Sequence, residues 1–199
     1  MHEHHARLFR LVIAAGAAFA AAGLAAPARA SLIVALDAPA MVERADTIAV
    51  VDVASVRAAW DAGHERIVTT VELSVVESWK GAAAPAARVV IAQPGGTVGD
   101  VTMTVFGMPR FSPGERALVF LRGAPDRARV VGLAQGKRAM RRDPAGGRWL
   151  VAPPERAGAA FVRRAASLQG LPPVFDTGPR PLDELRADVR ALMAGGGAR

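Results

Sequence analysis

Apolar and polar residues alternate along the first half of the chain, and this period of two is typical of β-strands that bury one face. The clearest case is Arg66–Trp79, in which Ile67 and Val71 fall on one face and Thr70 on the other. Thr47–Val56 is rich in β-branched and apolar residues, so it predicts a second strand. Asp and Gly between these runs favour a turn. The pattern therefore predicts an antiparallel hairpin.

Further short apolar runs follow, separated by segments rich in Gly and Pro that favour loops. The loops are expected at Lys80–Pro85 and Gly107–Gly114. The run ALVFL at Ala117–Leu121 is continuously apolar, as in a strand that is buried on both faces. The other predicted strands are Arg88–Gln93, Val101–Phe106, Arg129–Leu133, Arg138–Met140 and Trp149–Ala152.

Three segments favour helices. Pro39–Arg44 is long enough for about one helical turn. Glu155–Leu168 predicts a helix because Phe161, Ala165 and Leu168 then share a face. Pro181–Ala194 predicts an amphipathic helix, with Pro at its first position and acidic residues in its first turn. Its apolar stripe consists of Leu182, Leu185, Val189 and Leu192.

Short antiparallel strands followed by a helix predict a mainly β protein. We expect a small antiparallel barrel like the oligonucleotide/oligosaccharide-binding (OB) fold, because closure removes exposed strand edges. A two-sheet β-sandwich is the alternative. The barrel domain is expected at residues 31–152, and residues 153–199 are expected to form a Pro-rich linker and the C-terminal helix.

The N-terminus has the three parts of a secretory signal peptide. A polar start with two arginines precedes the apolar run Leu11–Leu24, and Pro27 and the small-x-small sequence Ala28–Ala30 follow. The run is shorter than the ~20 residues that a membrane-spanning helix needs. We therefore expect cleavage after Ala30, no transmembrane segment after cleavage, and a periplasmic or extracellular protein.

The absence of Cys excludes several kinds of site. A lipid-modified N-terminal cysteine, a thiolate metal site and a cysteine nucleophile all require that residue. His2, His4 and His5 belong to the predicted signal peptide, which leaves His64 as the one histidine of the mature chain. Residues 132–138 (GLAQGKR) have neither the Gly spacing nor the Ser/Thr of a phosphate-binding loop. We therefore expect no metal and no cofactor.

Charge is distributed unevenly along the chain. Residues 31–121 carry seven basic and ten acidic residues, whereas residues 122–164 carry eleven basic and three acidic residues. The arginine-rich segment 122–164 could attract an anionic partner, although it could also reflect a general preference for Arg, which outnumbers Lys 23 to 2. The candidate anion-binding residues are Arg127, Arg129, Arg138, Arg141, Arg142 and Arg148.

The aromatic content bears on the choice of partner. Single-stranded nucleic acid usually stacks on aromatic side chains, and this chain has no Tyr and three Trp. The sequence therefore disfavours nucleic acid. An acidic polymer of the cell envelope or an unidentified envelope protein is the expected partner.

Catalytic residues do not form a recognisable pattern. A Gly-x-Ser-x-Gly nucleophile elbow is missing, so a serine enzyme would need Lys80 or Lys137 as its base. A carboxylate hydrolase could draw on Glu72, Glu77, Asp100 and Glu115, which the pattern does not distinguish from ordinary surface acids. A non-enzymatic binding or protein-interaction module is therefore the preferred hypothesis, with an anion-binding surface protein and a hydrolase as alternatives.

Several phrases between residues 45 and 137 resemble a family of uncharacterised exported bacterial proteins. The order of an Ala45-Asp46 opening, Lys80-Gly81 after the second strand, and Gly114-Glu115 before Val119–Leu121 is also similar to netrin-like and metalloproteinase-inhibitor OB barrels. The resemblance implies an OB-like barrel outside the cytoplasm. Those inhibitors use disulfides and an N-terminal cysteine, so inhibition does not carry over to a chain without Cys. The other phrases of the resemblance are Thr47-Ile48, Ile67–Thr70, Trp79, Pro94–Gly96, Gly107–Phe111, Pro113 and Gly132–Lys137.

Overall fold

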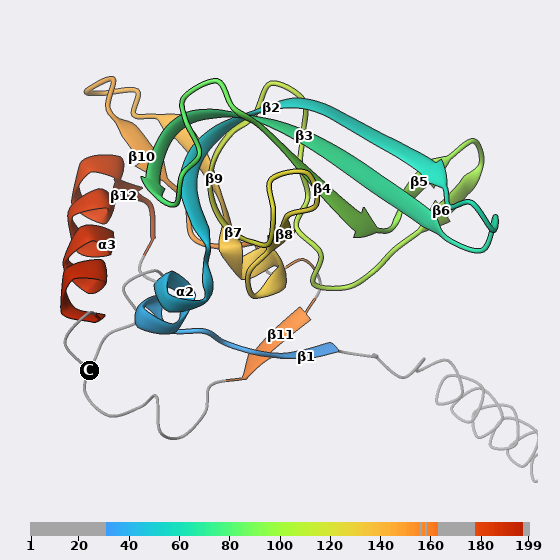
Figure 1. Cartoon of the computed structure of the whole chain (residues 1–199), viewed down its shortest axis with the longest axis horizontal. Coiled ribbons are helices and arrows are strands. Elements are labelled where there is room, and N and C mark those ends of the chain that lie inside the picture. The colour runs from blue at the N-terminus through green and yellow to red at the C-terminus, as the bar shows by residue number, and fades with distance from the viewer. Residues whose placement is uncertain (1–30, 156, 158, 163–177, 197–199) are drawn as a thin grey trace, which may run out of the picture. The chain divides into compact units, whose positions relative to one another are not determined.

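Two long antiparallel strands form the centre of the fold (Figure 1). The computed structural model describes residues 31–155, 157, 159–162 and 178–196, so the predicted signal peptide lies outside the described residues. Strand β2 (Thr47–Trp60) pairs with β3 (Ile67–Lys80) along nearly their whole length. The predicted hairpin is confirmed, and β2 extends four residues beyond the predicted end at Val56.

The main sheet has eight strands, and its pairings are antiparallel. Its order is β12-β10-β9-β7-β2-β3-β4, and β8 pairs with β7 beside this path. The mainly β prediction with antiparallel sheets is confirmed. The strands not yet given are β4 (Arg88–Pro94), β7 (Arg116–Arg122), β8 (Arg129–Val130), β9 (Lys137–Arg142), β10 (Trp149–Val151) and β12 (Arg180–Pro181).

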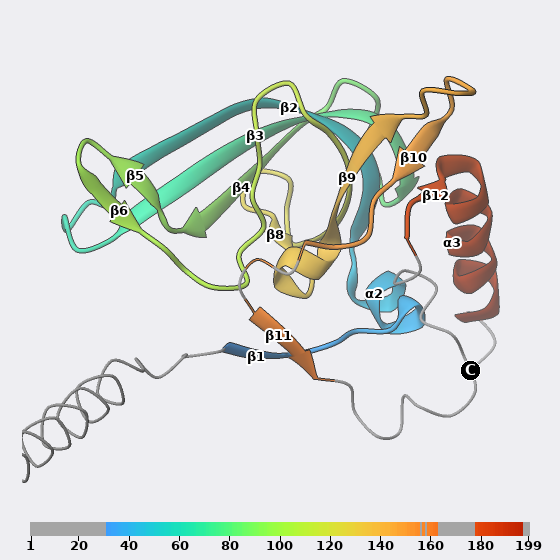
Figure 2. The same ribbon diagram turned by 180° about the vertical axis from the view of Figure 1, so that it is seen from behind.

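Strand β4 contacts the segment that leads into β8. The Val90 N–H donates to the Pro125 carbonyl at 2.7 Å, and the Ala128 N–H donates to the Val90 carbonyl at 2.9 Å. Ile91 and Ala128 form a single parallel bridge. Because β8 also pairs with β7, these contacts connect the β4 end of the sheet to its middle, and the sheet is strongly curved (Figures 1 and 2).

The curved sheet separates two apolar cores, because successive side chains of a strand point to opposite faces. On β7, Ala117, Val119 and Leu121 belong to the inner core, and Leu118 and Phe120 belong to the outer core. These five residues are at most 1% exposed. The prediction that this run is buried on both faces is therefore confirmed.

Two helices cover the outer core. Helix α2 (Ala38–Arg44) begins where the Asp37 carboxylate accepts the Ala40 N–H at 2.8 Å, as at many helix N-termini. Helix α3 (Leu182–Gly196) confirms the predicted C-terminal helix. Buried Leu185 and Val189 of α3 belong to the same core as residues of β2 and β7.

Several predicted elements differ from the structure. Ala159–Val162 form strand β11, which pairs in parallel with β1 (Ser31–Val34), so the prediction of a helix is wrong for these residues. Residues 163–168 of that prediction lie outside the described residues. Strand β5 (Gly96–Val98) was not predicted, and it pairs with β6 (Val101–Met103) in a small hairpin.

Among the described residues after 152, β12 and α3 join the same architecture as the earlier strands. Strand β12 pairs with β10, and α3 contacts α2 and β10. The described residues from Ser31 onward belong to one compact unit. Within the described part of the chain, no helix combines the length and the apolar character needed to cross a membrane.

Candidate functional site

Polar residues of the sequence phrases that resemble OB barrels make contacts inside the protein. The Lys80 ammonium donates to the carbonyls of Val42 at 2.8 Å and Glu43 at 3.5 Å, which belong to the last turn of α2. The Asp46 carboxylate accepts the Gly123 N–H at 2.8 Å. These residues satisfy backbone groups at the ends of elements, which are costly to leave unpaired.

Residues 132–137 (GLAQGK) hold two distant parts of the chain together through the side chain of Gln135. Gln135 lies in the 3-10 turn η1 (Leu133–Gly136), and its side chain is 4% exposed. Its Oε1 accepts the Leu36 N–H at 2.8 Å, and its Nε2 donates to the carbonyls of Val34 at 3.1 Å and Gly132 at 3.0 Å. One amide therefore joins the start of the described chain to this turn.

Lys137 forms a buried ion pair. Its side chain is 2% exposed, and its Nζ lies 2.5 Å from Glu115 Oε1 and 3.6 Å from Glu155 Oε1. The same Nζ lies 5.5 Å from the centre of the Phe111 ring, and the Ser112 N–H donates to Glu115 Oε2 at 3.1 Å. The pair ties β9 to the loop before β7.

The residues considered for a hydrolase do not converge. Glu72 pairs with Arg88 at 2.6 Å, and Glu77 pairs with Arg186 at 2.7 Å. The hydrogen bond from Arg88 lowers the pKa of Glu72, which keeps this carboxylate ionised. Asp100 is exposed between β5 and β6. Both candidate lysines hold the internal contacts described above, so the carboxylate and the Ser-Lys hypotheses gain no support from this geometry.

His64 lies in the turn between β2 and β3. Its φ is 55°, and its ring stacks on Trp60 with 6.0 Å between centroids. Asp61 of the same turn accepts the N–H groups of Glu65 and Arg66, and these hydrogen bonds lower its pKa. Within the described residues, no three or more His, Cys, Asp or Glu side chains gather where they could hold a metal ion.

The six arginines predicted to bind anions do not form one surface, which corrects the sequence prediction in two respects. Arg138 is 4% exposed and lies opposite Leu118 of β7, so it belongs to the interior. The other five fall into two groups. Arg129 pairs with Arg122 at one end of β7, whereas the register places Arg142 beyond the other end, about 25 Å away along the strand.

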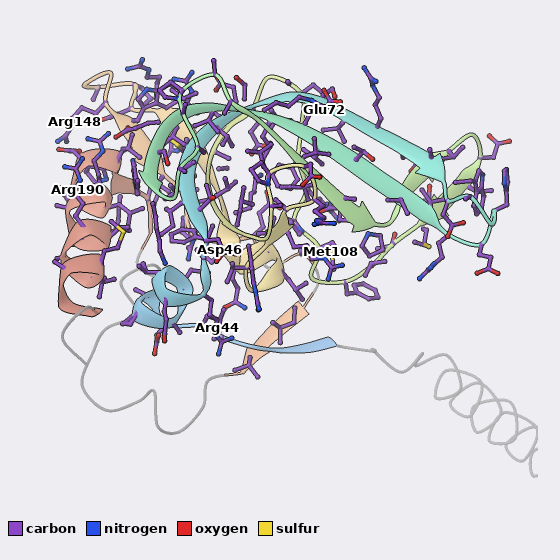
Figure 3. The ribbon with its side chains drawn as sticks, viewed as in Figure 1. Arg44, Asp46, Glu72, Met108, Arg148 and Arg190 are labelled. Atoms are coloured by element: carbon purple, nitrogen blue, oxygen red, sulfur yellow. The ribbon has the colours of Figure 1, made fainter. Side chains whose placement is uncertain are left out.

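Four arginines line two adjoining depressions beside β8. The first depression, of ≈ 580 Å³, is lined by Ala92 of β4 and by residues 122–124 and 127–129. The second, of ≈ 600 Å³, extends from β8 to α2. Figure 3 labels Arg44 at the end of α2 and Asp46 shortly after it in the chain. The members of this β8 arginine site are Arg44, Arg122, Arg127 and Arg129, and Arg122 and Arg129 line both depressions.

Two of these arginines face each other across neighbouring strands. Arg122 of β7 and Arg129 of β8 are register partners, which places their Cβ atoms about 5 Å apart on the same face. Like charges in this arrangement repel. Within the described residues, none of the four members of the site has an Asp or Glu oxygen within 4.0 Å. The site therefore gathers four guanidiniums that form no ion pair with the described residues.

The second group of predicted arginines is engaged in local contacts. The Arg142 guanidinium lies 4.3 Å from the centre of the Trp149 ring and donates to the Gly147 carbonyl at 2.6 Å. Arg116 also contacts Trp149, at 4.9 Å, and holds Asp52 through two hydrogen bonds of 2.7 Å. These hydrogen bonds lower the pKa of Asp52 and raise the pKa of Arg116. Arg148 directly precedes β10, in the turn that joins β9 to β10 (Figure 3).

A third depression, of ≈ 380 Å³, lies between the β5–β6 hairpin and the loop before β7. Phe106 at this depression is 50% exposed. Thr97 and Thr102 hydrogen-bond to each other at 2.9 Å, and Gln93 donates to the Pro109 carbonyl at 2.8 Å. Its lining is neutral apart from Arg110, so it does not share the charge of the β8 arginine site.

Sequence reasoning identified Arg127 and Arg129 but missed Arg44 and Arg122. Arg122 begins the arginine-rich segment, and its pairing with Arg129 could have been found from a short hairpin between Ala117–Leu121 and Arg129–Leu133. Arg44 carries no such signal, because α2 is distant in sequence. In comparisons of this chain with family models, curated proteins and solved structures, no match was found.

Proposed function

We propose that this protein is an exported, non-enzymatic binding module that holds an anionic ligand at the β8 arginine site. The observation that carries the proposal is the pairing of Arg122 with Arg129 without a carboxylate partner in the described residues. A guanidinium presents a planar fork of N–H groups that matches carboxylate and phosphate oxygens. An anion bound between the two forks would remove their repulsion and form charge-assisted hydrogen bonds.

The pairing order supports the OB-like part of the proposal. β2 pairs with β3 and β7, β3 pairs with β4, and β8 pairs with β7. The parallel bridge between Ile91 and Ala128 brings β4 beside β8. An OB barrel has five strands in this cyclic order, and its loops between the first and second and between the fourth and fifth strands commonly bind ligands. The turn that carries Arg127 corresponds to the second of these loops.

The proposed location outside the cytoplasm rests on the signal-peptide pattern of residues 1–30. An acidic envelope polymer and an acidic region of an envelope protein both offer the required anions. The β8 arginine site contains no aromatic side chain, so it lacks the stacking platform that single-stranded nucleic acid prefers.

Calorimetric titration with tripolyphosphate tests anion binding directly. We expect Arg122→Gln with Arg129→Gln to weaken binding by at least about tenfold, because each charge-assisted hydrogen bond contributes ~1.5–3 kcal/mol. Arg141→Gln with Arg142→Gln is the matched control, since it removes the same charge from the other group, and it should weaken binding by less than about threefold through the general field. Equal losses in both double variants would contradict the assigned site.

A further inference from the structure

We infer that the ligand of the β8 arginine site is an amphipathic anion, a free alkyl chain that carries one terminal carboxylate. The inference rests on the proposed function, because it places the carboxylate between Arg122 and Arg129. It adds that the second depression holds the alkyl chain.

The second depression is lined by both arginines and apolar side chains. The arginines are Arg44, Arg122 and Arg129. Val34 is 48% exposed, although valine is among the residues that are most often buried. Asp37 adds a carboxylate to the lining, and its Oδ1 accepts the Ala40 N–H at the start of α2. The apolar wall is formed by Ile33, Val34, Leu36, Ala40, Val131 and Leu133.

The apolar wall is held in place before any ligand binds. Apart from Ala40, its residues come from two segments, 33–36 and 131–133, that are far apart in the sequence. The buried Gln135 amide bonds to the backbone of Val34, Leu36 and Gly132, so it joins one segment to the other. A preformed groove lowers the ordering cost of binding. Its volume of ≈ 600 Å³ lies within the ~300–1,000 Å³ that is usual for small-molecule sites.

The combination of lining groups selects the ligand class. A highly charged polymer would place its next charges on the apolar wall, where they would lose water without gaining partners. A neutral alkyl chain would leave the two guanidiniums unpaired. A single terminal carboxylate with an alkyl chain satisfies both parts of the groove, and each buried methylene should raise the affinity about fourfold.

Calorimetric titration of the purified protein with hexanoate, octanoate and decanoate, below their micelle concentrations, tests this inference. We expect the affinity to rise about fourfold per methylene added. Arg122→Gln with Arg129→Gln should abolish binding of all three. Octanol at the same concentrations should bind at least about tenfold more weakly than octanoate, because it lacks the charged head.

Substitutions in the wall separate chain binding from anion binding. Val34→Thr with Leu133→Asn makes the wall polar, and Asn tolerates the φ of 60° at residue 133. This variant should show a weaker dependence on chain length, because Ile33, Leu36 and Val131 remain apolar, but it should bind tripolyphosphate as before. Val101→Thr is the matched control, because Val101 is 49% exposed and does not line this depression. It should behave like the unmodified protein.

The possible failures are distinguishable. Affinity that does not change with chain length, together with intact tripolyphosphate binding, would overturn the alkyl-chain inference and leave the proposed function standing. Equal affinity for octanol would also overturn it. Binding to vesicles of anionic lipid without binding to monomeric decanoate would overturn it in favour of a membrane surface. If neither tripolyphosphate nor decanoate binds, both proposals fail.

Discussion

Removing the carboxylate partner of Lys137 should destabilise the protein more than removing Lys137 itself. Glu115→Gln leaves an ammonium group that is 2% exposed without its partner at 2.5 Å. Lys137→Met leaves a carboxylate that is 18% exposed and keeps its hydrogen bond from the Ser112 N–H. The two substitutions break the same ion pair, but only the first leaves a deeply buried charge.

The structure sets the size of each effect. Removing one partner of a buried ion pair costs ~3–5 kcal/mol in favourable cases. Glu155 remains 3.6 Å from the Lys137 ammonium, so we expect about 2–3 kcal/mol for Glu115→Gln. A methionine at residue 137 fills most of the volume of the lysine stem, so Lys137→Met should cost about 1 kcal/mol or less. The double variant should resemble Lys137→Met.

Urea unfolding followed by tryptophan fluorescence measures these differences, because the chain has three Trp and no Tyr. The free energy of unfolding should fall in the order unmodified protein, Lys137→Met, Glu115→Gln, with an unchanged dependence on urea. A cost for Lys137→Met that equals or exceeds the cost for Glu115→Gln would refute the reasoning. A double variant much less stable than Glu115→Gln would refute it as well.

Three further predictions concern other contacts. Arg116 lowers the pKa of Asp52 in the folded protein below the ordinary value of 3.8, so this carboxylate contributes stability at neutral pH that is lost as the pH falls through the folded pKa. Asp52→Asn should therefore flatten the fall of Tm below about pH 4, and an unchanged acid profile would contradict this. Gln135→Ala should cost about 2 kcal/mol and speed amide hydrogen exchange at Leu36, whereas unchanged exchange would exclude this role of Gln135. Gly81→Ala should cost more than Gly99→Ala in thermal unfolding: both have positive φ, but of the two only Gly81 would place the new Cβ against a backbone atom, the Asp46 carbonyl oxygen at 2.6 Å. Equal losses in Tm would show that this collision is relieved without cost.

Local patterns predicted much of the fold because the main strands pair with neighbours in sequence. The β2–β3 hairpin is an example. The apolar run of β7 predicted burial on both faces for the same local reason. The failure at Ala159–Val162 has a different origin. These residues take strand geometry beside β1, whose sequence lies at the opposite end of the described chain, and such distant pairing can override local helical preference.

The site was less predictable than the fold. A charged side chain is expected to be exposed, so the sequence predicted exposure of every arginine. Arg138 is instead 4% exposed, opposite Leu118 of β7. The pairing of Arg122 with Arg129 follows from hairpin register, which depends on where the turn falls. Arg44 joins them through tertiary packing of α2, which no spacing in the sequence encodes.

The double burial of β7 makes helix α3 a condition for covering the outer core. Until Leu185 and Val189 of α3 are in place, the outer face that includes Leu118 and Phe120 lacks part of its cover. A chain interrupted before α3 would expose that apolar face and resemble the patches that drive aggregation. Displacement of α3 therefore turns a buried apolar face into an exposed one, which chaperones and proteases recognise.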